Sequence, residues 1–224
     1  MQGTTILFSE MTPPAGREEE FHAWYDEEHV PLRVGVPGFV SARRYRDTGE
    51  GAKGFLAVYE MDAPDVLKSS AYGEVKGKPS ALTKDMLANV SGFTRYIGQE
   101  TAVRRRAEGN APAALDAPLL YAVWFQVPED RCADFDAWYE QDHVPLLMES
   151  PDWLMVRRFR ITDGEPLPYN RLALHYLADR AALSSPAREK ARATPWRGRL
   201  AAEPWFKGTY SVFEALRPRQ KPAR

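Results

Sequence analysis

Two segments of the chain, 21–46 and 135–160, carry the same residue pattern in the same register without a gap. Each begins Phe-x-Ala-Trp-Tyr, continues through His-Val-Pro-Leu and a second proline, and ends in two arginines, an aromatic residue and a third arginine. The segments share 12 of 26 residues. A unit of about 100 residues that occurs twice predicts two copies of one fold packed about a pseudo-two-fold axis, so we expect a ligand pocket between the copies.

Each copy has the hydrophobic periodicity of a β-α-β-β-α-β unit. In the first copy the expected elements are strand 4–11, a helix from 18, strands 39–46 and 55–61, an interrupted helix 65–88 and strand 91–98. In the second they are 119–127, 130–147, 153–161, 171–177, 180–202 and 205–213. Such a unit forms an antiparallel sheet with helices on one face only, so the bare face needs a cover. The predicted fold class is α+β, with two ferredoxin-like repeats that form an intramolecular dimeric α/β barrel.

The boundaries follow from composition. We expect repeat 1 at 1–100, a linker rich in Arg, Ala, Gly and Pro at 101–117, repeat 2 at 118–216 and a basic, Pro-rich, disordered tail at 217–224.

Thirty basic and thirty-one acidic residues leave a net charge of -1, which argues against nucleic acid and anionic membranes as partners. No apolar run is long enough for a membrane span, and the first residues lack the pattern of a signal peptide, so we expect a cytoplasmic protein. The single cysteine, Cys132, has no partner for a disulfide or a metal cluster. Internal fusion predicts a monomer, and further dimerisation stays open.

The string Trp-Tyr-x-x-x-His-x-Pro, present in both copies and followed by a Pro-x-aromatic strand start, resembles the dimeric α/β-barrel superfamily, most closely its EthD-like branch. The resemblance covers about nine tenths of the chain. It implies a ferredoxin-like fold and a pocket lined by a histidine of the motif. Members of this superfamily include cofactor-independent cyclases, dehydratases, isomerases, quinone-forming monooxygenases and haem-binding enzymes, so the resemblance leaves the chemistry open.

Alternation along the strands predicts which side chains face the pocket. Val40, Ala42, Leu56, Val58 and their counterparts Leu154, Val156, Leu172 and Leu174 are expected under the helices. The expected substrate-binding residues are mostly aromatic with a few cations: Arg43, Arg157, Arg95, Phe39, Tyr45, Trp153, Phe159 and Tyr210. Such a lining favours a planar aromatic or polyketide-like ligand with a carboxylate or enolate oxygen. The alternative is that Arg43 and Arg157 pair with acidic residues outside the pocket, and a one-residue slip would exchange them with neighbouring arginines.

Four residues are the candidates for acid/base catalysis: His29, His143, His175 and Tyr59. His29 and His143 lie on the apolar stripe of their helices, near the helix end, and imidazole titrates near neutral pH. The alternative is a structural histidine that binds backbone carbonyls freed by the following proline. Tyr59 and His175 occupy equivalent strand positions and differ, as a single reaction centre requires, although a buried strand histidine is more often a hydrogen-bonded core residue.

The sequence predicts a small-molecule enzyme without a cofactor that performs cyclase, dehydratase or isomerase chemistry by proton transfer, with Arg43 or Arg157 stabilising an oxyanion. One alternative is a non-catalytic ligand-binding or stress-associated protein. Another is a cofactor-free or haem-dependent monooxygenase. We expect no metal site, because the consecutive acidic residues 26–28 point in different directions on a helix, and the sequence contains no phosphate loop or nucleophile motif.

Overall fold

The computed structural model describes residues 2–49, 52, 54–106, 111–166 and 168–223. These residues divide into two compact units. Unit 1 comprises Met1–Gln99, Thr162–Pro166 and Leu216–Arg224, and unit 2 comprises Glu100–Ile161 and Leu167–Ala215. Each unit contains one of the two sequence repeats and is described on its own below.

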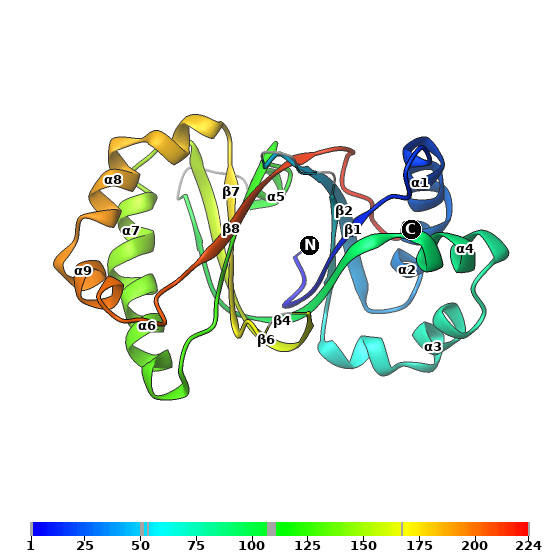
Figure 1. Ribbon diagram of the computed structural model, residues 1–224, viewed down its shortest axis with the longest axis horizontal. Coiled ribbons are helices and arrows are strands. Elements are labelled where there is room, and N and C mark those ends of the chain that lie inside the picture. The colour runs from blue at the N-terminus through cyan, green and yellow to red at the C-terminus, as the bar shows by residue number, and fades with distance from the viewer. Residues whose placement is uncertain (1, 50–51, 53, 107–110, 167, 224) are drawn as a thin grey trace. The chain divides into compact units, whose positions relative to one another are not determined.

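Unit 1 has the predicted β-α-β-β-α-β order. Its elements are β1 (Thr5–Thr12), α1 (Glu18–Trp24), a π-helical turn (Tyr25–His29), α2 (Val30–Val34), β2 (Phe39–Asp47), β3 (Phe55–Met61), a 3₁₀ turn (Pro64–Lys68), α3 (Ser70–Gly77), α4 (Ala81–Asn89) and the part of β4 (Ser91–Arg105) that ends at Gln99. The strands pair antiparallel in the order β4-β1-β3-β2, which is the ferredoxin-like order. The helices of this unit cover one face of its strands (Figure 1).

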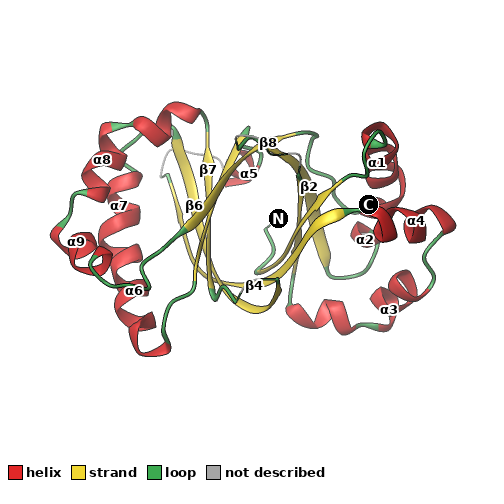
Figure 2. Cartoon of the chain, viewed as in Figure 1, coloured by secondary structure: helices red, strands yellow, loops and turns green. Residues whose placement is uncertain are grey.

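Unit 2 repeats this arrangement after the short helix α5 (Ala111–Leu115). It contains β5 (Leu119–Phe125), a 3₁₀ turn (Glu129–Arg131), α6 (Cys132–Trp138), a π-helical turn (Tyr139–His143), α7 (Val144–Leu147), β6 (Trp153–Glu165), β7 (Arg171–Leu177), a 3₁₀ turn (Arg180–Ser184), α8 (Pro186–Arg192), α9 (Pro195–Ala201) and β8 (Thr209–Ala215). The strand order is β8-β5-β7-β6. In the colouring by secondary structure, α6 to α9 lie on one side of the strands of this unit (Figure 2).

A π-helical turn in each repeat explains why the sequence motif is so rich in buried rings. The Val30 N–H donates to the Tyr25 carbonyl five residues back, and the helix continues past the proline as α2. The inserted residue widens the turn, so Trp24, Tyr25 and His29 are all buried against the sheet. The histidine of the motif therefore lies inside a continuous helical run rather than at a helix end, which corrects the sequence-based expectation.

A β-bulge at the start of the second strand of each repeat changes which side chains face the helices. The pairing register shifts between Phe39 and Ser41 in β2 and between Trp153 and Met155 in β6. Phe39 and Trp153 consequently belong to the hydrophobic cores under the helices. The prediction that these two rings face away from the helices was wrong, because the bulge interrupts the alternation of side chains along each strand.

The third strands face opposite to the prediction. Tyr59 pairs directly with Ala42, and His175 pairs directly with Val156, so each pair shares one face of its sheet. Both Ala42 and Val156 belong to the cores under the helices, and so does Tyr59. Tyr59 and His175 therefore point toward the helices. Beyond the bulge, the predicted alternation of β2 and β6 is correct: Ala42 and Val156 pack under the helices, and the residues between them point to the other face.

The segments predicted as a linker and as a disordered tail both contain regular structure or contacts. The 101–117 linker holds the end of β4 and all of α5, although residues 107–110 of it lie outside the described residues. In the predicted tail, Gln220 exchanges two backbone hydrogen bonds with Ala42, and Arg217 pairs with Asp26. The sequence-based domain boundaries stay predictions. No helix formed by the described residues has the length and apolar character needed to cross a bilayer.

Candidate functional site

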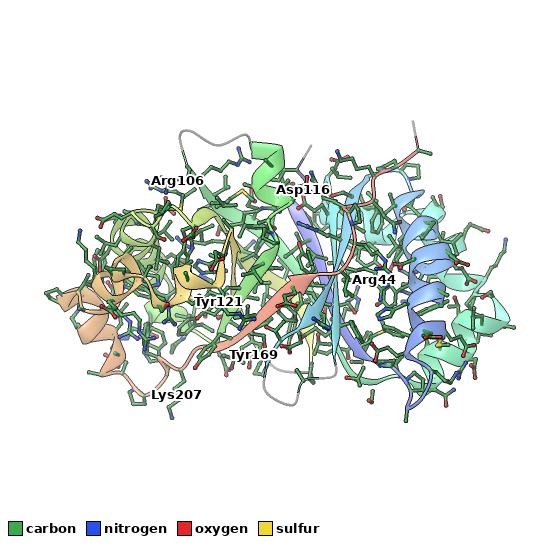
Figure 3. The ribbon with its side chains drawn as sticks, turned by 90° about the horizontal axis from the view of Figure 1, so that it is seen from above. Arg44, Arg106, Asp116, Tyr121, Tyr169 and Lys207 are labelled. Atoms are coloured by element: carbon green, nitrogen blue, oxygen red, sulfur yellow. The ribbon has the colours of Figure 1, made fainter. Side chains whose placement is uncertain are left out.

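A cavity of about 220 Å³ lies in unit 2, bordered by side chains of its sheet and of its helices. Its lining is rich in aromatic rings, and Tyr121 of β5 is one of them (Figure 3). The polar groups at the cavity are two histidines, three arginines and three tyrosines. The lining residues include Tyr139, His143, Trp153, His175, Arg188, Arg192, Arg197 and Tyr210. Concave, mostly apolar sites with a few polar groups are typical of small-ligand binding.

A hydrogen-bonded chain of three buried side chains borders the cavity. The Trp153 indole N–H donates to Nδ1 of His175 at 3.0 Å, and Nε2 of His175 lies 2.9 Å from the Tyr139 hydroxyl oxygen. Because an indole nitrogen can only donate, Nδ1 must be unprotonated, and the single imidazole proton is on Nε2. His175 therefore donates to the Tyr139 oxygen and leaves the phenolic proton of Tyr139 available for another acceptor.

Burial determines the protonation states in this chain. It lowers the pKa of His175 well below its usual value, and nearby His143 and Arg188 act in the same direction. Burial also raises the pKa of Tyr139 well above its usual value. His175 is thus a neutral positioning group at pH 7, and Tyr139 keeps its proton and can donate a hydrogen bond.

His143 is the second polar group at the cavity. Its Nδ1 lies 3.3 Å from the carbonyl oxygen of Ala191 in α8, so Nδ1 carries the proton and donates it there. Its other nitrogen, Nε2, has no hydrogen-bond partner among the residues that the structure describes and remains an acceptor. Burial lowers the pKa of His143 to about 4, opposed by the bond to Ala191 and assisted by nearby arginines. The ring centroid lies 5.2 Å from that of Tyr139, so the two rings are neighbours in the cavity lining.

Three arginines of α8 and α9 border the same cavity. Arg188 donates to the Leu183 carbonyl at 2.7 Å, and Arg197 donates to the Arg192 carbonyl at 3.2 Å. Burial lowers the pKa of Arg197, and the positive charges of Arg192 and Arg188 lower it further. The cavity therefore has a positively charged wall.

The structure brings four of the predicted site residues to this cavity: His143, His175, Trp153 and Tyr210. Their first-copy counterparts lie in the core of unit 1. Tyr59 and His29 are both buried, with 1% and 4% of their surface exposed. The Tyr59 hydroxyl and Nδ1 of His29 have no hydrogen-bond partner among the described residues. Burial lowers the pKa of His29 and raises that of Tyr59. Phe39 packs against Tyr59 in this core, with ring centroids 6.0 Å apart.

The remaining predicted residues lie elsewhere. Arg43 and Tyr45 of β2, and Arg157 and Phe159 of β6, alternate with residues of the helix-side cores and so lie on the other face of their sheets. Nε of Arg157 donates to Glu100 at 2.6 Å, which matches the alternative of an arginine paired with an acidic residue.

Arg95 forms an ion pair with Asp163 at 2.8 Å and does not border the cavity of unit 2. Arg44, which follows Arg43 in β2, lies on the helix side of its sheet (Figure 3), where it pairs with Asp26 at 2.7 Å. All assigned catalytic and substrate-binding roles remain predictions.

Sequence reasoning missed Arg188, Arg192 and Arg197. A signal was available, because Arg188 and Arg192 are four residues apart on one helix, where like charges repel and normally are avoided unless something compensates them. The hydrophobic pattern of the segment predicts only an interrupted helix and does not indicate which face carries the charges.

Comparison with known proteins gives matches among solved structures only. An anthrone oxidase-like protein is 11% identical, with 98% of this chain and 94% of that chain covered and a TM-score of 0.68. A monooxygenase candidate from Fusobacterium nucleatum is 11% identical, covering 99% and 96%, with a TM-score of 0.61. A chlorite dismutase candidate is 17% identical, covering 96% of each chain, with a TM-score of 0.54. No family model and no curated protein matches this chain.

At such low identity these likenesses show the fold alone. The chain has an α+β fold of the dimeric α/β-barrel type, in which one chain carries both ferredoxin-like repeats. The predicted fold class is confirmed. The assignment to the EthD-like branch and the predicted pocket between the two repeats stay predictions.

Proposed function

We propose that this chain is a small-molecule enzyme that moves a proton on a planar organic molecule bound in the cavity of unit 2. The observation that carries the proposal is the pairing at one cavity of an acceptor, Nε2 of His143, with a donor, the hydroxyl of Tyr139. The two groups can act on one ligand, because their rings lie 5.2 Å apart.

The step that fits this pair is enolisation. His143 Nε2 takes a proton from a carbon next to a carbonyl group, the C–H electron pair forms a C=C bond, and the π pair of the carbonyl moves onto its oxygen. The Tyr139 hydroxyl donates a hydrogen bond to that oxygen, as an oxyanion hole does. His143 then returns the proton at another atom, which completes an isomerisation. Alternatively, the enolate carbon attacks a second carbonyl carbon of the ligand and the oxygen of that carbonyl takes the proton from His143, which completes a cyclisation.

His175 and Trp153 act as positioning residues in this scheme. Their hydrogen bonds fix the tautomer of His175 and thereby direct the Tyr139 proton away from His175. Such orientation of a catalytic group by a buried partner is how enzymes preorganise their donors before the reaction. The neutral state of His143 at pH 7 makes it ready to accept a proton, and negative charge developing on the ligand would raise its pKa.

A second candidate is a cofactor-free oxygenase. Two proteins of the same fold are described as anthrone oxidase-like and as a monooxygenase candidate. The same enolate, or a phenolate, would donate electrons to molecular oxygen in place of recovering its proton. A haem-dependent reaction does not fit this cavity, because about 220 Å³ is below the roughly 300–1,000 Å³ of sites for drug-sized ligands, and a porphyrin is larger still.

The test uses phenylpyruvate, a single-ring carbon acid, as the probe in D₂O. Wild-type protein should accelerate exchange of the benzylic protons, followed by NMR, and His143→Gln should lose that acceleration. His29→Gln, the equivalent change in the repeat whose histidine does not border the cavity, is the matched control and should keep it. Binding of the probe without faster exchange would overturn the proposal in favour of a ligand-binding protein, and oxygen uptake would favour the oxygenase.

A cytoplasmic location and a single-chain state remain part of the proposal.

A further inference from the structure

The three arginines at the cavity of unit 2 differ from their neighbours on the same helices. Lys190 of α8 pairs with Glu149 at 2.7 Å, and Arg199 of α9 pairs with Asp134 at 3.4 Å. Arg188, Arg192 and Arg197 form no ion pair with any carboxylate among the described residues, and Arg188 and Arg197 donate only to neutral groups there. The outward-facing charges of α8 and α9 are thus neutralised, and the cavity-facing charges are not.

This imbalance is costly for the free protein. Arg188 and Arg192 are four residues apart on α8, where two like charges destabilise a helix. Arg188 and Arg197 are half-buried, so solvent screens them less than it screens surface charges. Burial lowers the pKa of Arg197, a group that normally stays protonated at every accessible pH, and the positive charges of Arg192 and Arg188 lower it further. An anion placed between these guanidinium groups would remove the repulsion and gain charge-assisted hydrogen bonds.

The rest of the cavity indicates what the anion is attached to. Its wall consists largely of aromatic rings, including Tyr121, Phe125, Trp138 and Phe206, which suit a flat ring. An apolar cavity of about 150 Å³ holds one benzene molecule. The volume of about 220 Å³ therefore fits one ring with one polar substituent, which narrows the planar aromatic or polyketide-like ligand that the sequence predicts.

We propose that this cavity binds a single-ring aromatic molecule that carries a carboxylate or another oxyanion, with the oxyanion held by Arg188, Arg192 and Arg197. The ring lies among the aromatic side chains, toward His143 and Tyr139. Arg192 is exposed and Tyr210 is 64% exposed, so both lie where the cavity opens to solvent and the anion can enter. The inference rests on the proposed function only for the statement that this ligand is a substrate.

The experiment measures binding of three probes by calorimetry: benzoate, phenyl phosphate and the neutral isostere benzamide. Benzoate or phenyl phosphate should bind at least about tenfold more tightly than benzamide, since charge-assisted hydrogen bonds are about twice as strong as neutral ones. The tighter of the two anions identifies the oxyanion as carboxylate or phosphate. Equal affinity for all three probes would overturn the inference.

Variants assign the effect to the three arginines. Arg192→Gln and Arg197→Gln should each weaken benzoate binding by about tenfold and leave benzamide binding unchanged. Arg199→Gln, a change of the same type on the outward face of α9, is the control and should bind benzoate as wild type does. Arg192 is exposed, so its replacement does not threaten folding, and unchanged benzoate affinity in this variant would refute the assignment.

The salt dependence of the wild-type protein gives a readout without any variant. Benzoate affinity should fall as ionic strength rises, and benzamide affinity should not. Failure of this inference can be told from failure of the proposed function, because His143→Gln should keep benzoate binding and lose proton exchange. Arg192→Gln should weaken benzoate binding and raise the KM for phenylpyruvate.

Discussion

The hydrogen bond between Trp153 and His175 can be tested by a matched pair of substitutions. Trp153 is fully buried and donates to Nδ1 of His175 at 3.0 Å. Trp138 borders the same cavity and is 2% exposed, but its indole nitrogen has no hydrogen-bond partner among the described residues. Trp153→Phe and Trp138→Phe therefore remove the same ring volume from one core, and only the first breaks a hydrogen bond.

The expected difference follows from that bond. Each replacement loses apolar contacts and leaves a small void, at a cost of about 1–3 kcal/mol. Trp153→Phe also leaves Nδ1 of His175 buried without its donor, which adds about 1–3 kcal/mol. The free energy of unfolding should therefore fall further for Trp153→Phe than for Trp138→Phe, by the value of the bond.

Urea denaturation of the two variants and wild type measures this difference, and the ¹⁵N shifts of the His175 ring report its tautomer. Wild type and Trp138→Phe should show the proton on Nε2, and Trp153→Phe should show a mixture of tautomers. Equal losses of stability in the two variants, together with an unchanged tautomer in Trp153→Phe, would refute the reasoning that Trp153 fixes the state of His175.

Three further predictions concern other buried polar groups. Burial raises the pKa of Glu10 to about 7, so the free energy of unfolding should fall by up to about 3 kcal/mol as pH rises from 4.5 to 7, and Glu10→Gln should remove this slope in urea titrations at several pH values. Tyr59→Phe deletes a hydroxyl without a partner among the described residues and should leave thermal stability unchanged or higher, whereas Tyr139→Phe breaks the bond to His175 and should cost about 1–2 kcal/mol. The pKa of His143 is lowered to about 4, so stability present above pH 6.5 should be lost as pH falls toward 4, and a His143→Gln variant that shows the same acid-side slope would contradict this.

The repeat and its periodicity were sufficient to predict the fold. The twelve residues that the two segments share show that one structural unit occurs twice in the chain. Within each copy, alternating apolar residues predict the strands and apolar residues at helical spacing predict the helices, which gives the β-α-β-β-α-β order. The orientation of the third strands was not predictable in this way. Phe55–Met61 and Arg171–Leu177 are almost continuously apolar, so alternation within them carries little information about facing. Only cross-strand pairing, such as Tyr59 with Ala42, determines the face.

The candidate site was predicted in part for the same physical reasons. The motif histidine His143 was predicted from the apolar stripe of its helix. Tyr210 was predicted for the sheet face away from the helices, but it pairs with Val123 and borders the cavity on the helix side. The arginines of α8 and α9 were missed, because a cationic face on a short helix has a charge pattern in the sequence but no hydrophobic one. Trp153 was selected for a pocket on the opposite face, and it reaches this cavity because the bulge in β6 turns it toward the helices.

The most direct test measures the pKa of the His143 ring by NMR, with and without saturating benzoate. It asks whether the arginines of α8 and α9 and the base His143 contact one and the same ligand. Without benzoate the ring should titrate near pH 4, because burial and the three arginines disfavour its charged form. With benzoate bound, the anion should offset the arginine charges and shift the titration upward by a measurable fraction of a pH unit or more. An unchanged His143 titration at saturating benzoate would contradict the account.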